Sequence, residues 1–303
     1  MTELVHDRRF EPRYGEAVSV APGVRRITAP NPGPFTFHGT NTYLVGERDL
    51  AVIDPGPDDE RHFAALLAAI GRVEVAAILV THTHRDHSPG ARRLAAATGA
   101  PMIGAGPHRP ARPPLPGEEA RLDAAGDMDF VPDRLVADGA VAAGTGWALA
   151  AIATPGHCAN HLAFALLGRD LLFSGDHVMA WSTSIVAPPD GAMADYMASL
   201  ARLVACPQTT YLPGHGGPVE DAPAYVAALA GHRRRREAAI LARLAAGDDT
   251  IPAIVASVYR GVDPALHPAA ALSVLAHVED LAARGEVVSD GVPSLTARLA
   301  LAR

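Results

Sequence analysis

Four short apolar runs, each leading directly into histidine or aspartate, constrain the fold of this chain more than any other feature. Their length, and the glycine or proline that closes most of them, are typical of buried strands rather than helices. The runs and their closing turns span residues 75–80, 147–156, 169–175 and 209–214. Because an α/β fold assembles a site from side chains at the ends of separate strands, we expect these four strand ends to meet.

Alanine- and leucine-rich segments with helical patterns separate the runs. Two of them span residues 59–71 and 90–99. The chain has 303 residues, of which 49% are hydrophobic, so it can bury a large core. The alternation of strands and helices predicts an α/β fold in which helices cover β-sheets.

The charge of the chain argues against a general polyanion binder. The net charge is −7, and all 26 cationic side chains are arginine, so we do not interpret isolated arginines as phosphate contacts. Residues 1–18 are charged and lack an apolar stretch, and no apolar span of about 20 residues follows. We therefore expect a cytoplasmic protein without a membrane segment, in which Cys158 and Cys206 do not form a disulfide scaffold.

Residues 81–87, THTHRDH, gather three histidines and an aspartate in one short loop. His82 and His84 are two positions apart, so in an extended loop they point the same way. Asp86 and His87 follow where the chain turns toward the next helix, so they can face a neighbouring point. One motif can therefore begin two metal sites, although a polar loop that is merely rich in histidine is the alternative.

Three single residues downstream supply the ligands that two such sites still need. His157, Asp176 and His215 each end a glycine-bearing turn, TPGH, SGD and PGH. Glycine lets the backbone turn tightly, so that the side chain reaches inward. Zinc prefers imidazole and carboxylate ligands, and catalytic zinc sites keep one position open for water. The sequence therefore predicts a metal centre built from distant segments.

The motifs THTHRDH, TPGH, SGD and LPGHGGP, in this order over about residues 24–220, resemble the metallo-β-lactamase superfamily of metal-dependent hydrolases. The resemblance implies an αββα sandwich, in which two β-sheets are flanked by helices, and two zinc ions that hold a hydroxide between them. Manganese or iron would also suit such ligands. The resemblance also implies which residues bind the metals. The first ion would be bound by His82, His84 and His157, the second by Asp86, His87 and His215, and Asp176 would bridge both.

A closer resemblance covers residues 31–46, 53–57 and 174–200, which are similar to the β-lactamase-like protein 2 hydrolases. Members of that group carry a C-terminal winged-helix domain, and some are endoribonucleases that act on single-stranded RNA. RNA cleavage is thus one predicted reaction, in which Asp86 would orient the attacking hydroxide or transfer a proton. The alternative, favoured by the acidic charge, is hydrolysis of a small-molecule ester, thioester or lactone. An iron-dependent thiol dioxygenase on the same scaffold is a third possibility, and such relatives usually bind one metal.

Past residue 231 the pattern changes to three helices and a short hairpin marked by Asp-Gly, which predicts a winged-helix domain. We therefore divide the chain into a hydrolase domain, 1–230, and a C-terminal domain, 231–303. The arginine run at 233–237 is interpreted as the solvated start of a helix. From residue 232 on, nine arginines face eight acidic residues, too little positive charge for a phosphate-driven contact. We expect this domain to pack on the hydrolase domain or form a homodimer contact, and not to bind DNA.

Several further side chains are weaker candidates. The resemblance implies that Asp54 hydrogen-bonds a ligand histidine and fixes its tautomer, and an ordinary turn aspartate is the alternative. Residues 101–116 are rich in proline, so they cannot form a helix interior or a central strand, and we expect a surface excursion, with a flap near the site as the alternative. The other candidates for supporting or pocket positions, which turn capping or core packing would equally explain, are His161, Asn41, Thr42, Ser182 and Thr183.

Overall fold

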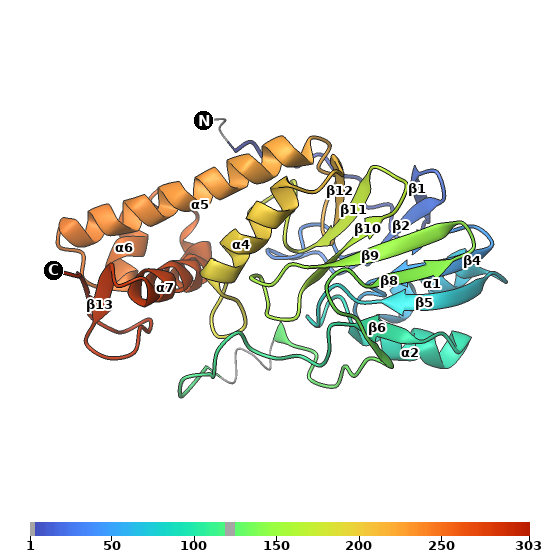
Figure 1. The fold of residues 1–303 in the computed structure, drawn as a ribbon, viewed down its shortest axis with the longest axis horizontal. Helices are drawn as coiled ribbons and strands as arrows, with labels where there is room; N and C mark the ends of the chain where they lie inside the picture. Colours follow the sequence, from blue (N-terminus) through green and yellow to red (C-terminus); the bar gives the residue numbers. More distant parts are fainter. Residues whose placement is uncertain (1–3, 119–124) are drawn as a thin grey trace.

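The computed structural model describes residues 4–118 and 125–303, and its larger part is a sandwich of two β-sheets (Figure 1). The first sheet has seven strands in the order β1–β2–β3–β4–β5–β6–β7, and the second has five in the order β12–β11–β10–β9–β8. The first sheet contains β1 Val18–Ala21, β2 Val24–Thr28, β3 Asn41–Val45, β4 Asp49–Ile53, β5 Glu74–Leu79, β6 Met102–Gly104 and β7 Arg134–Leu135. The second contains β8 Val141–Gly144, β9 Trp147–Ala153, β10 Leu162–Leu166, β11 Leu171–Gly175 and β12 Thr210–Pro213.

Helices cover both outer faces of the sandwich, which confirms the predicted αββα fold. α1 (Glu60–Ile70) and α2 (Pro89–Thr98) pack on the first sheet and lie within one residue of the two predicted helices. α4 (Met193–Val204) and part of α5 (Ala222–Ala245) pack on the second sheet. Each sheet thus buries both of its faces, which explains why its central strands are apolar throughout.

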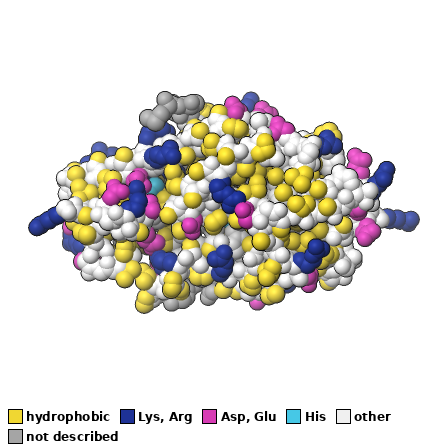
Figure 2. Space-filling view, viewed as in Figure 1, with side chains coloured by type: hydrophobic (Ala, Val, Ile, Leu, Met, Phe, Trp, Pro, Cys, Tyr) yellow, Lys and Arg dark blue, Asp and Glu magenta, His cyan; other side chains and the backbone are white. Residues whose placement is uncertain are grey.

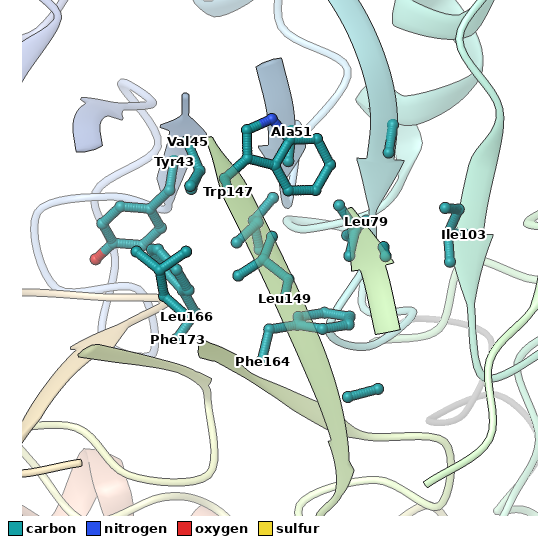
Figure 3. Close-up of a cluster of buried hydrophobic side chains, with 14 of the residues drawn as sticks. Tyr43, Val45, Ala51, Leu79, Ile103, Trp147, Leu149, Phe164, Leu166 and Phe173 are labelled. Atoms are coloured by element: carbon teal, nitrogen blue, oxygen red, sulfur yellow. The ribbon is translucent and has the colours of Figure 1, made fainter. Parts of the chain in front are cut away.

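The inner faces of the two sheets form one apolar core. Side chains alternate along a strand, so in β3 Tyr43 and Val45 face the second sheet, while Leu44 packs beneath the outer helices. Trp147 and Phe173 come from the second sheet into the same cluster (Figure 3). The rings of Tyr43 and Phe173 have their centroids 5.1 Å apart. This packing fixes the two sheets against each other, and with them the loops at their ends.

The four apolar runs of the sequence are strands β5, β9, β11 and β12, as predicted. Backbone hydrogen bonds tie the loops beyond their C-terminal ends together. Leu162 N donates to Thr81 O at 2.7 Å, and Gly214 N donates to Gly175 O at 2.9 Å. The strand ends therefore meet at one edge of the sandwich, where α/β folds bind ligands.

The prediction for the proline-rich residues 101–116 is wrong in part. Met102–Gly104 form strand β6, which lies between β5 and β7 in the first sheet. These three residues keep their N–H groups, and Pro101 contributes only its carbonyl, which accepts a hydrogen bond from Ile78 N at 3.0 Å. A proline beside a short strand is therefore compatible with a place inside the sheet.

The C-terminal part has the three helices and the hairpin that the sequence predicts, around an apolar core of its own. The loop between the two hairpin strands, residues 290–298, is longer than an Asp-Gly turn alone requires. None of the described helices is both long and apolar enough to cross a membrane. After α5 come α6 Ile251–Val258, a short 3-10 helix Pro264–Leu266, α7 His267–Ala283, β13 Val287–Ser289 and β14 Leu299–Leu301.

Helix α5 differs from the prediction because it begins at Ala222 and runs unbroken through Gly231. The arginine run 233–237 therefore lies in the middle of a helix rather than at its solvated start, and Arg233 is only 4% exposed. α5 and α7 both contact α4, so the C-terminal part packs on the hydrolase part, as expected (Figure 1). The division of the chain between residues 230 and 231 stays a proposal, and it falls inside this helix.

Candidate metal centre

The loops that carry the predicted ligands pack so closely, on one another and on helix α4, that two of their glycines leave no room for a side chain. A Cβ atom on Gly214 would come within 2.4 Å of Asp176 Oδ1 and 2.6 Å of His87 Cε1. Gly156 has φ +139°, and a Cβ atom there would lie 2.3 Å from Tyr196 Cα. Glycine is therefore required at both turns, one by close approach and one also by its backbone angle.

The first triad consists of His82, His84 and His157, whose candidate ligand atoms all lie within 4.8 Å of one another. His84 Nδ1 is 3.1 Å from His82 Nε2 and 2.9 Å from His157 Nε2. Zn–N bonds of about 2.0–2.1 Å in tetrahedral geometry would separate such nitrogens by about 3.3 Å. The three imidazoles therefore present nitrogens at nearly the spacing that one metal ion requires.

The second triad consists of Asp86, His87 and His215 and forms a separate group of the same compactness. Asp86 Oδ2 lies 3.2 Å from His87 Nε2 and 3.2 Å from His215 Nε2. The structure thus brings together three residues that the sequence holds up to about 130 positions apart, His87 and His215 being 128 apart.

Asp176 lies between the two triads. Its Oδ2 is 3.2 Å from His215 Nε2 in the second triad and 3.8 Å from His157 Nε2 in the first, and its Oδ1 is 3.4 Å from His87 Nε2. Oδ1 is buried and has no hydrogen-bond partner among the described residues. A buried carboxylate with an unused oxygen between two sets of imidazoles fits a bridging ligand.

The outward nitrogen of every triad histidine lies beside an oxygen that can only accept its proton. Carbonyl and carboxylate oxygens accept, and the Thr81 hydroxyl already donates its own proton to Asp54 Oδ2 at 2.6 Å. In the neutral rings, the inner nitrogens are therefore left with free lone pairs for a cation. The pairs are His82 Nδ1 with Thr81 Oγ1 (2.9 Å), His84 Nε2 with Asp190 Oδ2 (2.7 Å), His87 Nδ1 with Asp54 Oδ2 (2.9 Å), His157 Nδ1 with Ile185 O (2.6 Å) and His215 Nδ1 with Gly39 O (3.1 Å).

The electrostatics of the centre favour a bound cation. Burial lowers the pKa of His82 well below its usual value and that of His157 to about 4. Burial also opposes a charge on His215, but Asp176 and Asp86 outweigh it and raise the pKa of His215 to about 9. Burial opposes ionisation of both carboxyls as well, yet the facing histidines hold each pKa well below its usual value. Two ionised carboxylates, Asp176 buried and Asp86 partly buried, draw positive charge onto neighbouring imidazoles and suit divalent metal ions.

Two of the weaker candidates lie directly behind the ligands. Asp54 Oδ2 accepts hydrogen bonds from His87 Nδ1 and Thr81 Oγ1, so this side chain contacts a ligand histidine as expected. His161 Nε2 accepts a hydrogen bond of 3.2 Å from the backbone N–H of Asp176. Both residues are buried, and both are placed to orient ligands rather than to contact a substrate.

Asn41 and Thr42, predicted as pocket candidates, are fully buried and do not line a pocket. Asn41 Nδ2 donates to Gly216 O at 2.9 Å and so holds the loop that carries His215. Thr42 Oγ1 donates to Asp54 O at 2.6 Å. Their polar groups are used inside the protein, which is the physical reason for the correction. The two other pocket candidates are partly exposed, and contact with a substrate stays a prediction for Ser182 and Thr183.

Sequence reasoning missed two residues that contact the centre, Thr40 and Asp190, and a third, His108, that lies behind Asp190. Thr40 Oγ1 donates to Asp86 Oδ2 at 2.9 Å. Asp190 accepts from His84, as described above, and His108 Nε2 lies 3.6 Å from the other oxygen of Asp190. Asp190 stands in the sequence PPDG, which is typical of a turn, and no local pattern marks Thr40 or His108.

The αββα sandwich and the paired triads at its strand ends define a class of protein, the metal-dependent hydrolases built on a metallo-β-lactamase fold. The sequence pattern described as "Metallo-beta-lactamase superfamily" matches residues 35–215, well over half of the chain. The chain therefore belongs to this superfamily of hydrolases, whose members bind divalent metals. The pattern described as "Beta-lactamase associated winged helix domain" matches residues 250–292 and confirms the C-terminal prediction.

Similar proteins extend over most of the chain. A beta-lactamase-like protein 2 homolog from Caenorhabditis elegans is 31% identical over 222 residues, 72% of this chain and 70% of the relative. An atrochrysone carboxyl ACP thioesterase from Aspergillus fumigatus is 29% identical over 242 residues, 78% of this chain and 69% of the relative. The crystal structure of a metallo-beta-lactamase family protein from Thermus thermophilus has a TM-score of 0.75 and 25% identity, covering 93% of this chain and all of the other. The predicted resemblance to the β-lactamase-like protein 2 group is thus confirmed.

Proposed function

We propose that this chain is a two-metal hydrolase that cleaves acyl thioesters, with zinc as the preferred metal. The observation that carries the proposal is the orientation of the five triad histidines. Each turns one nitrogen to an acceptor outside the centre and the other toward the remaining ligands. Three histidines would hold the first ion, Asp86, His87 and His215 the second, and Asp176 both.

Metal ions bound there would lower the pKa of a water molecule and polarise the scissile carbonyl. The chain's own residues would orient the reactants. Thr40 fixes one oxygen of Asp86 by a hydrogen bond of 2.9 Å, so this carboxylate has a defined direction. Asp86 would orient the attacking water by accepting a hydrogen bond from it, and would take up its proton.

The choice of a thioester rests on relatives and on charge. Several similar proteins are named ACP thioesterases, among them the Aspergillus fumigatus protein and one from Claviceps purpurea.

A covalent route through cysteine is unfavourable here, because burial raises the pKa of the Cys158 thiol well above its usual value. Water is therefore the nucleophile that this site would supply.

Cleavage of single-stranded RNA is the second candidate function, since the chain is similar to beta-lactamase-like protein 2 homologs. Its charge is less favourable for that substrate. The net charge is −7, and arginines and acidic side chains are interspersed on the face that Figure 2 shows. A phosphate backbone is normally bound by clustered cationic side chains.

The complete second triad favours hydrolysis over the one-metal dioxygenase that the sequence left open. His87 and His215 are buried, Asp86 is partly buried, and the three lie at ligand spacing. Two bound metal ions per chain, with His215 engaged, would count against a one-metal dioxygenase. Esters and lactones remain related substrates, because the same attack on a carbonyl would cleave them.

The test compares the chain with its Asp176→Asn variant on a panel of substrates. The panel contains an acyl thioester of N-acetylcysteamine, the matching oxygen ester and labelled single-stranded RNA. We expect thioester hydrolysis by the wild type and a loss of about a hundredfold or more in the variant. RNA cleavage that the variant loses, without thioester hydrolysis, would establish the second candidate instead. An activity that persists in the variant would come from a contaminant.

A further inference from the structure

Residues 184–190 run along the outer side of the metal ligands and contact three of them. Ser184 Oγ donates to the backbone carbonyl of Asp176 at 2.5 Å. Ile185 O accepts from His157 Nδ1 at 2.6 Å, and Asp190 Oδ2 accepts from His84 Nε2 at 2.7 Å. One short segment thus supports two members of the first triad and the residue between the triads.

The start of this segment is fastened to helix α5 by Arg233. The Arg233 guanidinium donates to Ser184 O and lies 5.0 Å from the centroid of the Tyr196 ring. The Tyr196 hydroxyl in turn donates to His177 O at 2.8 Å, next to Asp176. A buried arginine is costly unless its donors find partners, and Arg233 Nε has none among the described residues, so its place depends on the bond to Ser184 O and the contact with Tyr196.

The end of the segment is fastened to helix α7 through the proline-rich loop. Ala111 N donates to Pro189 O at 2.8 Å. The neighbouring Arg112 bonds Glu279 of α7 through Nη2 at 2.6 Å, and also bonds Glu118. The proline-rich loop therefore links helix α7, through Arg112, to the backbone carbonyl of Pro189, next to Asp190.

Close packing makes the position of this segment matter for the ligands. A Cβ atom on Gly191, directly after the segment, would lie 2.4 Å from Gly156 O and 2.6 Å from His157 O. Backbone meets backbone here without a side chain between them. A displacement of the segment would therefore move the turn that carries His157.

We infer that residues 184–190 position His84, His157 and Asp176 for metal binding, and that α5 and α7 hold them in place through Arg233 and Glu279. The role of the C-terminal helices would then be to brace the metal centre. The inference rests on the proposed two-metal function. Arg233 and Glu279 are positioning residues, since they act on the centre only through the segment.

The test measures metal affinity by competition with a chelator in backgrounds that keep one triad. His215→Ala retains the first triad, and His84→Ala retains the second. In the His215→Ala background, we expect Arg233→Met and Glu279→Gln each to weaken zinc binding about tenfold, and Arg233→Lys to restore part of it. In the His84→Ala background, the same changes should weaken binding less than about threefold.

Matched controls change neighbouring charges that do not reach the segment. Arg234→Met removes the next arginine of the run, which is exposed. Glu286→Gln removes a glutamate that pairs with Arg284 at 3.1 Å within the C-terminal part. We expect both controls to bind zinc like their parent backgrounds.

The outcomes separate the inference from the function on which it rests. If neither single-triad background binds zinc, the proposed metal centre is wrong. If both bind, and Arg233→Met and Glu279→Gln bind as tightly as the controls, the positioning role is overturned. If Arg233→Met loses helical circular dichroism, the variant is misfolded and Glu279→Gln decides the test. The Glu279 side chain is 21% exposed, and this change removes only its ion pair with Arg112.

Discussion

The two triads of the metal centre are supported by different parts of the chain. In the second triad, His215 is held by Gly39 O, Asp86 by Thr40 and His87 by Asp54, so every support comes from the strands and loops of residues 39–54. In the first triad, His84 and His157 are held by residues 184–190, which the C-terminal helices fasten. Only His82 has its support, Thr81, within its own motif.

This difference means that the two sites can be disturbed separately. Supports that orient metal ligands typically change metal affinity by about 10- to 100-fold when they are removed. A change near residues 39–54 should act on the second site, and a change near residues 184–190 should act on the first. Substitution of a residue that contacts both triads should lower the metal affinity of both sites and have the largest effect.

The largest effect is expected for Asp176→Asn, because Asp176 lies against both triads. The neutral amide keeps the size of the side chain but removes the charge that faces His215 and His157. We expect both metal affinities to fall and hydrolysis to drop about a hundredfold or more. Metal content and turnover measured on the same preparation would check this, and loss of one ion only would contradict the bridging position.

The next largest effect is expected for Asp54→Asn. Asp54 accepts from Thr81 N and Thr81 Oγ1 as well as from His87, and an amide offers only one acceptor oxygen. With the amide nitrogen in place of Oδ2, both His87 Nδ1 and Thr81 Oγ1 would lose their acceptor. We expect about a hundredfold weaker binding at the second triad and a smaller loss at the first, through Thr81 and His82. Titration of the His84→Ala and His215→Ala backgrounds distinguishes the two sites, and equal losses in both would require a different explanation.

Asp190→Ala should weaken the first triad alone. The change leaves the Nε2 proton of His84 without its acceptor, so the ring loses the bond that orients its inner nitrogen. We expect about tenfold weaker metal binding in the His215→Ala background and unchanged binding in the His84→Ala background. A loss of affinity confined to the second triad would show that Asp190 does not support the first triad.

The smallest effect on metal binding is expected for Thr40→Val, which leaves the shape of the side chain but removes its hydrogen bonds to Asp86 and from Asn31. A hydrogen bond to an ionised carboxylate contributes about 1.5 kcal/mol, or about tenfold. We expect turnover to fall by that factor while the first triad keeps its affinity. Thr40→Ser, which retains the hydroxyl, is the matched control and should behave like the wild type.

The sequence could predict the candidate ligands because each stands in a short motif at the end of a strand. His82, His84, Asp86 and His87 share one loop, and the strand ends that carry the others meet once the sandwich forms. Their supports lack such marks, because Gly39 contributes a backbone carbonyl and Asp190 stands in an ordinary turn sequence. Contacts between distant loops depend on tertiary packing, which a local pattern does not contain.

Arg233 shows how one misplaced helix boundary hid the contact with Ser184 on which the proposed positioning role depends. A helix beginning at residue 232 puts the arginine run in solvent. The helix that begins at Ala222 has buried positions at Val226, Leu229, Arg233 and Ile240, which follow the helical repeat. The correct start would have placed Arg233 on the apolar stripe and predicted its burial. The strand at residues 102–104 was missed because the prolines of the segment argued against a strand, although these three residues are not proline and keep their N–H groups.

The central claim, that the two triads bind two metal ions on which hydrolysis depends, is tested most directly by metal analysis of chain purified without chelator. We expect about two ions per chain, loss of both metal and thioester hydrolysis after chelation, and recovery on adding zinc. Well under one ion per chain, with no gain in activity on adding zinc or manganese, would contradict it.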